Sequence, residues 1–183
     1  MTPYRWFSLL CLAGCLSSTR RLIAQQHPRG EVRPPVYHFT SVAISDSSFA
    51  TVVGENGVIL RTTDGGATWA RQASGTLSLL TDVSFPARDT GVTVGESGLI
   101  LRTTNGGAAW ALVPSPTSVK LRATCFLSTS IGLAVGDSGV IVRSRDGGAT
   151  WIFVPSPKRE SLLDIACLGP DTAIVVEIGR AHV

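Results

Sequence analysis

The chain is poor in charge, in methionine and in tyrosine. Charged side chains make up 16% of its 183 residues, and it holds one methionine and two tyrosines. A disordered tail is excluded, because such segments combine high charge with few apolar residues, whereas 44% of this chain is hydrophobic. No apolar run reaches the roughly 18 residues that a membrane-spanning helix needs, which excludes a multi-span membrane protein. The abundance of valine, isoleucine, threonine and glycine favours β structure over a helical bundle.

The net charge of +3 lies in the N-terminal segment. Residues 1–36 carry five arginines and one glutamate, whereas residues 37–176 carry ten basic and eleven acidic side chains. The body of the protein is therefore nearly neutral and lacks the basic surface that a phosphate backbone requires. We expect no nucleic-acid partner.

Residues 1–18 are typical of an export signal, with Arg5 followed by a short apolar core. The stretch Leu12-Ala13-Gly14-Cys15 resembles the lipobox of bacterial lipoproteins, which implies a lipidated Cys15 and a membrane tether. Ordinary signal cleavage further along, or a start codon placed wrongly, are the alternatives. Residues 19–36 are expected to form a polar linker. The sequence thus predicts an exported protein, periplasmic or at the cell surface.

A repeat of 41 residues organises the remainder of the chain. The segments 53–69, 94–110 and 135–151 align without an insertion, and each repeat reads as four short strands separated by turn residues. Four strands in about 40 residues are typical of a propeller blade. The sequence therefore predicts an all-β fold, a β-propeller fragment of about three and a half four-stranded blades. The expected units are blade 1 (37–76), blade 2 (77–117), blade 3 (118–158) and a partial blade 4 (159–176).

A glycine-rich turn ending in tryptophan closes each repeat. Its pattern Ser/Thr-x-Asp-x-Gly-x-x-Trp resembles the Asp-box, or BNR repeat, of sialidase-like and sortilin-like propellers. The longer repeat resembles the photosystem II assembly and stability factor family, over residues 37 to about 176. This resemblance implies a non-catalytic scaffold that binds a protein client, such as a membrane protein, without a cofactor. The turn residues are Asp64, Gly65, Gly66, Trp69, Asn105, Gly106, Gly107, Trp110, Asp146, Gly147, Gly148 and Trp151. Asn105 and Ala109 depart from the pattern, and we expect them to weaken the second turn.

Arg61, Arg102 and Arg143 form a second periodic set, each directly after an apolar strand. Two roles are open for this arginine column. Each guanidinium can pair locally, with the turn aspartate or with the acidic residue before the strand, and so hold the hairpin. Alternatively, the column forms a basic track that recognises carboxylates of a client bidentately. In the resembled family, a basic propeller surface that engages a membrane-protein client is what the column implies.

A catalytic site is not evident. The sequence has no HExxH, CxxC, P-loop or Gly-x-Ser-x-Gly motif, and no metal site is expected. The acidic residues that recur with the repeat, Glu55, Glu96 and Asp137, are interpreted as parts of solvated turns. A sialidase-type propeller needs a tyrosine–glutamate pair, and neither Tyr4 nor Tyr37 is well placed for one. We therefore expect a non-enzyme, with a glycan-binding or sialidase-like BNR propeller as the alternative.

The cysteines of the body, Cys125 and Cys167, lie in apolar strand-like runs. They can pair in an oxidising compartment, but the apolar context favours two small core residues.

Residues 177–183 resemble the translation of a sequencing adapter, and we expect that they are not natural protein. Codons other than GAG ATC GGA AGA GCA CAC GTC, or genomic sequence beyond them, would contradict this. A partial ring leaves one blade face uncovered, so the chain alone is expected to aggregate or oligomerise.

Overall fold

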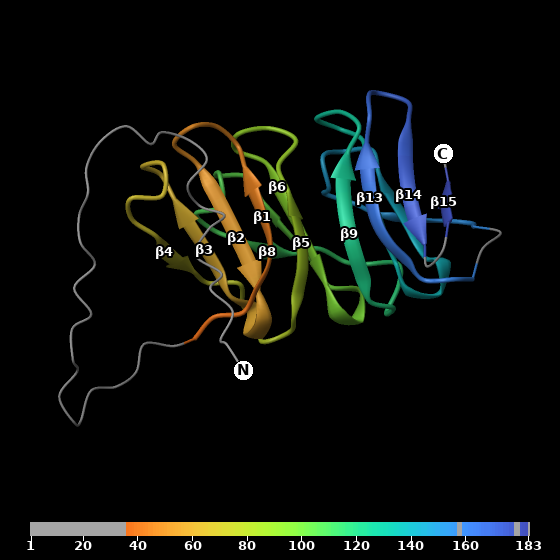
Figure 1. The fold of residues 1–183 in the computed structure, drawn as a ribbon, viewed down its shortest axis with the longest axis horizontal. Helices are drawn as coiled ribbons and strands as arrows, with labels where there is room; N and C mark the ends of the chain where they lie inside the picture. Colours follow the sequence, from red (N-terminus) through yellow and green to blue (C-terminus); the bar gives the residue numbers. More distant parts are fainter. Residues whose placement is uncertain (1–35, 157–158, 178–179, 183) are drawn as a thin grey trace, which may run out of the picture. The chain divides into compact units, whose positions relative to one another are not determined.

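A computed structural model describes residues 36–156, 159–177 and 180–182 of the chain. The expected leader, Cys15 and nearly all of the expected linker lie outside the described residues. Residues Val36–Val183 form one unit, built from antiparallel sheets that follow one another in chain order (Figure 1). Three sheets have four strands and the last has three, which confirms the predicted all-β propeller fragment. None of the helices in the described part of the chain is long and apolar enough to cross a membrane.

Each four-stranded sheet repeats one arrangement, with its strands paired in sequence order. The strands of blade 1 are β1 (Phe39–Ile44), β2 (Ala50–Gly54), β3 (Ile59–Thr62) and β4 (Ala70–Gln72). Those of blade 2 are β5 (Leu80–Ser84), β6 (Gly91–Gly95), β7 (Ile100–Thr103) and β8 (Ala111–Leu112). Those of blade 3 are β9 (Leu121–Phe126), β10 (Gly132–Gly136), β11 (Ile141–Ser144) and β12 (Ile152–Val154). Short 3₁₀ turns join the second and third strands: η1 (Glu55–Gly57), η2 (Glu96–Gly98) and η3 (Asp137–Gly139).

The last sheet consists of β13 (Leu162–Cys167), β14 (Ala173–Glu177) and β15 (Arg180–His182). β13 and β14 keep the bulged register of the repeat, because Leu162 pairs with Glu177 as Leu80 pairs with Gly95. β15 departs from the repeat, since Glu177 pairs directly with Arg180, whereas five residues separate Val53 from its partner Ile59 in blade 1. The predicted partial blade ended at residue 176 and did not include this third strand. An edge strand can pair with many sequences, so the origin of residues 177–183 stays a prediction.

The apolar core lies between neighbouring sheets. Val53 and Ile59 of blade 1 pack with Leu80 and Leu101 of blade 2, and all four are almost fully buried. This placement explains the continuous apolar runs of blades 2 and 3, because each of these sheets is covered by a neighbouring sheet on both faces. The innermost strands β1, β5, β9 and β13 lie side by side (Figure 1).

A disulfide joins Cys125 of β9 to Cys167 of β13, with 5.9 Å between their Cα atoms. The expectation of two unpaired core cysteines was wrong. Each cysteine does lie in an apolar strand, but the two strands are adjacent across the boundary between blades 3 and 4. The apolar context of one strand carries no information about which strand lies beside it.

Candidate functional site

The first glycine-rich turn is closed by the carboxylate of Asp64. Its Oδ1 accepts hydrogen bonds from the Thr62 hydroxyl (2.7 Å) and from the Thr68 backbone N–H (2.9 Å). Its Oδ2 accepts one from the Thr68 hydroxyl (2.5 Å). These donors, the Thr68 hydroxyl first, lower the pKa of Asp64 to about 2. These hydrogen bonds hold the turn without a contact from a neighbouring blade.

The third turn repeats this network and the second retains part of it. Asp146 accepts hydrogen bonds from the hydroxyl and the N–H of Thr150 and from the Ser144 hydroxyl, which lower its pKa to about 2. Asn105 still accepts from the Thr103 hydroxyl and the Ala109 N–H, both at 2.9 Å. Alanine has no hydroxyl, so one hydrogen bond of the other turns cannot form here. The missing hydrogen bond is the reason why we expect the second turn to be less stable than the other two.

The tryptophans of the second and third repeats each donate a hydrogen bond to their own turn. Trp110 Nε1 donates to the Gly107 carbonyl (3.2 Å), and Trp151 Nε1 donates to the Gly148 carbonyl (3.1 Å). The Trp110 ring meets Phe85 edge-on, with 6.0 Å between the ring centroids. The indole thus satisfies its polar atom and adds an aromatic contact.

The second and third turns also pack against the preceding blade. Gly107 has a φ of 83°, and a Cβ there would lie 3.2 Å from the Thr51 Oγ1 of blade 1. A Cβ on Gly148 would lie 2.5 Å from the Val92 Cγ2 of blade 2. Glycine is therefore required at each of these positions for two reasons: the backbone is left-handed, and the neighbouring blade leaves no room for a side chain.

Arg61 and Arg102 reach across these boundaries between blades. Arg61 Nε donates to the carbonyl of Gly106 (2.6 Å), and Arg102 Nε donates to that of Gly147 (2.8 Å). Both arginines are half-buried. The hypothesis of local pairing within one repeat was wrong, because each partner belongs to the next repeat and is a backbone carbonyl.

The third member, Arg143, has a buried Nε with no hydrogen-bond partner. Two of the acidic residues that the local hypothesis offered are engaged elsewhere: Asp137 with Arg122 (2.5 Å) and Glu96 with Lys120 (3.7 Å). Among the residues that the structure describes, no carboxylate lies within ion-pair distance of the arginine column. Within the described ranges, the column therefore carries positive charge that no ion pair compensates.

An aromatic contact beside Arg61 was not predicted. The ring of Phe49 lies 5.3 Å from the Arg61 guanidinium carbon and 4.2 Å from that of Arg88, which pairs with Asp46 at 3.3 Å. Both contacts are cation–π interactions. Phe49 and Arg88 do not recur in the other blades, so the repeat gave no signal for them.

Asp82 is the second feature that sequence reasoning missed. Its Oδ1 accepts from the Ser41 hydroxyl (2.6 Å) and its Oδ2 from the Thr124 N–H (2.7 Å), so it links blades 1, 2 and 3. Burial raises its pKa, with the nearby Asp164 charge acting in the same direction. Both oxygens hold neighbouring blades in place, which is a structural role.

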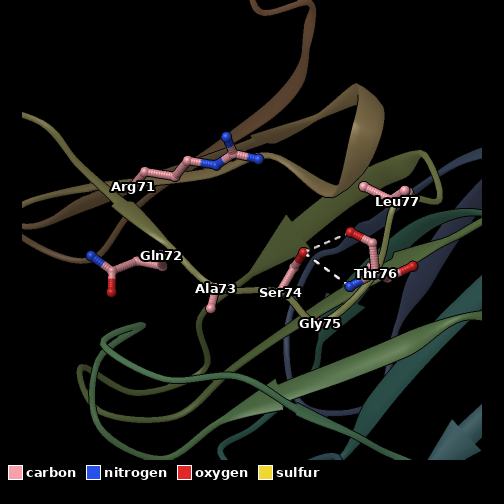
Figure 2. Close-up of a pocket in the computed structure, with 7 residues that line it drawn as sticks. All are labelled: Arg71, Gln72, Ala73, Ser74, Gly75, Thr76 and Leu77. Carbon is pink, nitrogen blue, oxygen red and sulfur yellow. Dashed lines mark hydrogen bonds between the residues drawn. The ribbon is translucent and has the colours of Figure 1, made fainter.

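A shallow hollow of about 590 Å³ lies beside the connection from blade 1 to blade 2 (Figure 2). Its lining is one continuous segment, Arg71–Leu77, in which the Ser74 hydroxyl donates to the Thr76 carbonyl (3.2 Å). That lining contains no carboxylate, histidine or cysteine. Across the described ranges, no three such residues gather closely enough to hold a metal ion.

Comparisons with known proteins agree with this architecture. Residues 34–122 match the family model described as photosynthesis system II assembly factor YCF48. The solved structure of YCF48 bound to D1 peptide is 22% identical, with a TM-score of 0.66 over 81% of this chain and 54% of that one. YCF48 from Cyanidioschyzon merolae is 20% identical, with a TM-score of 0.61 over 79% and 54%. The chain thus spans about half the length of these relatives.

A more distant likeness is to an ancestral GH74 enzyme, at 14% identity and a TM-score of 0.59, over 75% of this chain and 21% of that one. At these identities the solved structures show the fold alone. No curated protein sequence matches the chain.

Proposed function

Because residues 34–122 place this chain in a photosystem II assembly factor-like β-propeller family, we propose that it is a non-catalytic scaffold that binds a protein client through its arginine column. One solved relative, YCF48, is bound to D1 peptide. We transfer from it the class of client, an extended polypeptide segment, and infer that carboxylates of this segment are the groups recognised.

The observation that carries this proposal is the position and the hydrogen bonding of the three guanidinium groups. Each arginine occupies the same place on the third strand of its blade, and Nε of Arg61 and of Arg102 is fixed by a carbonyl. A guanidinium has five N–H donors, so the terminal nitrogens keep donors beyond this bond. A positioned fork of this kind binds a carboxylate with two parallel hydrogen bonds.

The test uses labelled D1 peptide as the probe and fluorescence anisotropy as the readout. Replacing Arg61, Arg102 and Arg143 together by lysine keeps the charge and removes the fork. We expect the dissociation constant to rise by about tenfold or more, because hydrogen bonds between charged groups contribute about 1.5–3 kcal/mol each.

The matched control is Arg145→Lys, an exposed arginine two positions from Arg143. This variant should bind as the wild type does, and circular dichroism should show that every variant keeps its β structure. Unchanged binding by the triple variant would contradict recognition by the column. A wild-type chain that does not bind the peptide would contradict a client of this class.

The absence of catalysis is part of the proposal. Asp82 has the raised pKa that a general acid needs, but its oxygens are engaged by blades 1 and 3. The glycosidase alternative predicts hydrolysis of chromogenic glycosides that is lost in Asp82→Asn. We expect no hydrolysis by either protein.

We further propose that the protein is exported. The Cys125–Cys167 disulfide supports this, because disulfides persist in oxidising compartments. Tethering through a lipidated Cys15 predicts that the protein sediments with membranes and that Cys15→Ala releases it, whereas Cys11→Ala does not. Equal sedimentation of wild type and Cys15→Ala would contradict the tether.

A further inference from the structure

The disulfide occupies the place of an aromatic contact that recurs in the other blades. Cys167 stands 41 positions after Phe126, which itself stands 41 positions after Phe85. Phe85 packs against the core between blades 1 and 2, and Phe126 packs against the core between blades 2 and 3. Cys167 lies at the equivalent boundary, between blades 3 and 4.

The residue that pairs with Cys167 also departs from the repeat. A Cβ on Gly91 would lie 2.6 Å from the Phe85 ring, and a Cβ on Gly132 would lie 2.7 Å from the Phe126 ring. The equivalent residue in the last sheet is Ala173, which pairs with Cys167 across β13 and β14. The smaller side chain at position 167 makes room for that methyl group. The exchange of phenylalanine for cysteine is therefore accommodated locally.

The partner cysteine is also a departure from the repeat. Cys125 stands at the position of Ser84, so the pair is confined to the boundary between blades 3 and 4. The core there consists of Ala123, Val135, Leu162 and Ile165, with fewer large side chains than the boundary between blades 2 and 3. A covalent bond thus holds the last sheet where the other boundaries have a phenylalanine ring beside a tryptophan.

We propose that Cys125–Cys167 is a site of thiol–disulfide exchange, and that a dithiol reductant releases β13–β15 from blade 3 through it. Both cysteines are partly exposed, so a small dithiol has access to the sulfurs. A thiolate of the reductant attacks one sulfur, the S–S bond breaks, and the other cysteine leaves as a thiolate. The second thiol of the reductant then attacks the mixed disulfide and releases the attacked cysteine. Two electrons and two protons pass to the protein, and the reductant becomes a disulfide.

The experiment treats the folded full chain with dithiothreitol and follows two readouts. Alkylation with peptide mapping reports free thiols at Cys125 and Cys167 separately from the two cysteines near the N-terminus. Hydrogen exchange of β13 reports the attachment of the last sheet, with β6 of blade 2 as the internal reference. We expect both thiols to appear and exchange in β13 to rise on the order of a hundredfold, while exchange in β6 stays constant. Reoxidation should restore the original protection.

Three outcomes would overturn the proposal. In the first, the bridge resists reduction until the whole chain unfolds. In the second, both thiols appear but protection of β13 is unchanged. In the third, protection is lost in β13 and β6 together, which would make the bridge a requirement for the whole fold.

The double variant Cys125→Ser/Cys167→Ala serves as a permanently reduced form. Its β13 should exchange as fast as that of the reduced wild type, with or without dithiothreitol. Protection equal to that of the oxidised wild type would also overturn the proposal.

Discussion

The Arg102 side chain donates a hydrogen bond of 2.8 Å from its Nε to the carbonyl of Gly147, which lies in the turn of the following blade. Arg61 makes the same bond to Gly106 one repeat earlier. Because Asp146 and its donors hold the acceptor turn rigid, the carbonyl has a fixed position for the guanidinium. The arginine of one repeat and the glycine turn of the next thus form one structural unit.

Removing this bond should destabilise the protein. We expect Arg102→Met to lower the free energy of unfolding by about 1.5–3 kcal/mol, because it leaves the buried Gly147 carbonyl without its charged donor. Arg143→Met is the matched comparison and should cost clearly less, since its Nε has no acceptor. Denaturant unfolding measures both. Equal losses would contradict a special role for the bond between blades.

The sequence predicts the repeats well and the contacts between them poorly. Glycine and tryptophan at a constant spacing identify the blades, because each turn is closed by residues within five positions of one another. The partner of Arg61 lies 45 positions away, and the partner of Cys125 lies 42 positions away. Neither distance follows from the pattern within one repeat. Asp82 recurs only as Asp164, two repeats later, while Ser41 and Ala123 occupy the same position in blades 1 and 3, so its role across three blades becomes visible only in the fold.

The two turn aspartates should make stability depend on pH in the acid range. Their folded pKa values are about 2, below the ordinary 3.8, so their contribution is complete above pH 3.8 and is lost as the pH falls toward 2. The variant Asp64→Asn/Asp146→Asn should lose less stability than the wild type over this interval. Denaturation midpoints at several pH values measure the difference between the two proteins. The opposite effect of Asp82 cancels from this difference, because both proteins contain that residue. Parallel curves for the two proteins would contradict the lowered pKa values.

Restoring the consensus in the second turn should stabilise it. In Asn105→Asp/Ala109→Thr, the new hydroxyl can donate to the new carboxylate as Thr150 donates to Asp146. We expect the free energy of unfolding to rise by about 0.5–1 kcal/mol. A thermal melt measures this gain, with Ala108→Thr at a neighbouring exposed position as the control. A gain of equal size in the control would show that the turn network is not its cause.

The outer face of blade 1 should promote self-association. Val42 and Ile44 are 56% and 74% exposed, whereas Val83, the equivalent of Val42 in blade 2, is 5% exposed because blade 1 covers it. We expect light scattering to show oligomers of the 19.2 kDa chain, and Ile44→Lys to reduce them. Leu77→Lys, at a leucine 81% exposed in the connection between blades, should leave them unchanged. A wild-type chain that is monomeric at all concentrations would contradict this prediction.

The most direct test of client recognition observes the arginines themselves. Nuclear magnetic resonance resolves the side-chain Nε–H signal of each arginine, and D1 peptide can be added stepwise to the labelled protein. The account predicts that the signals of Arg61, Arg102 and Arg143 shift with a common saturation curve, while that of Arg145 stays in place. Saturable binding that leaves the three column signals unmoved, or that shifts only arginines outside the column, would contradict it.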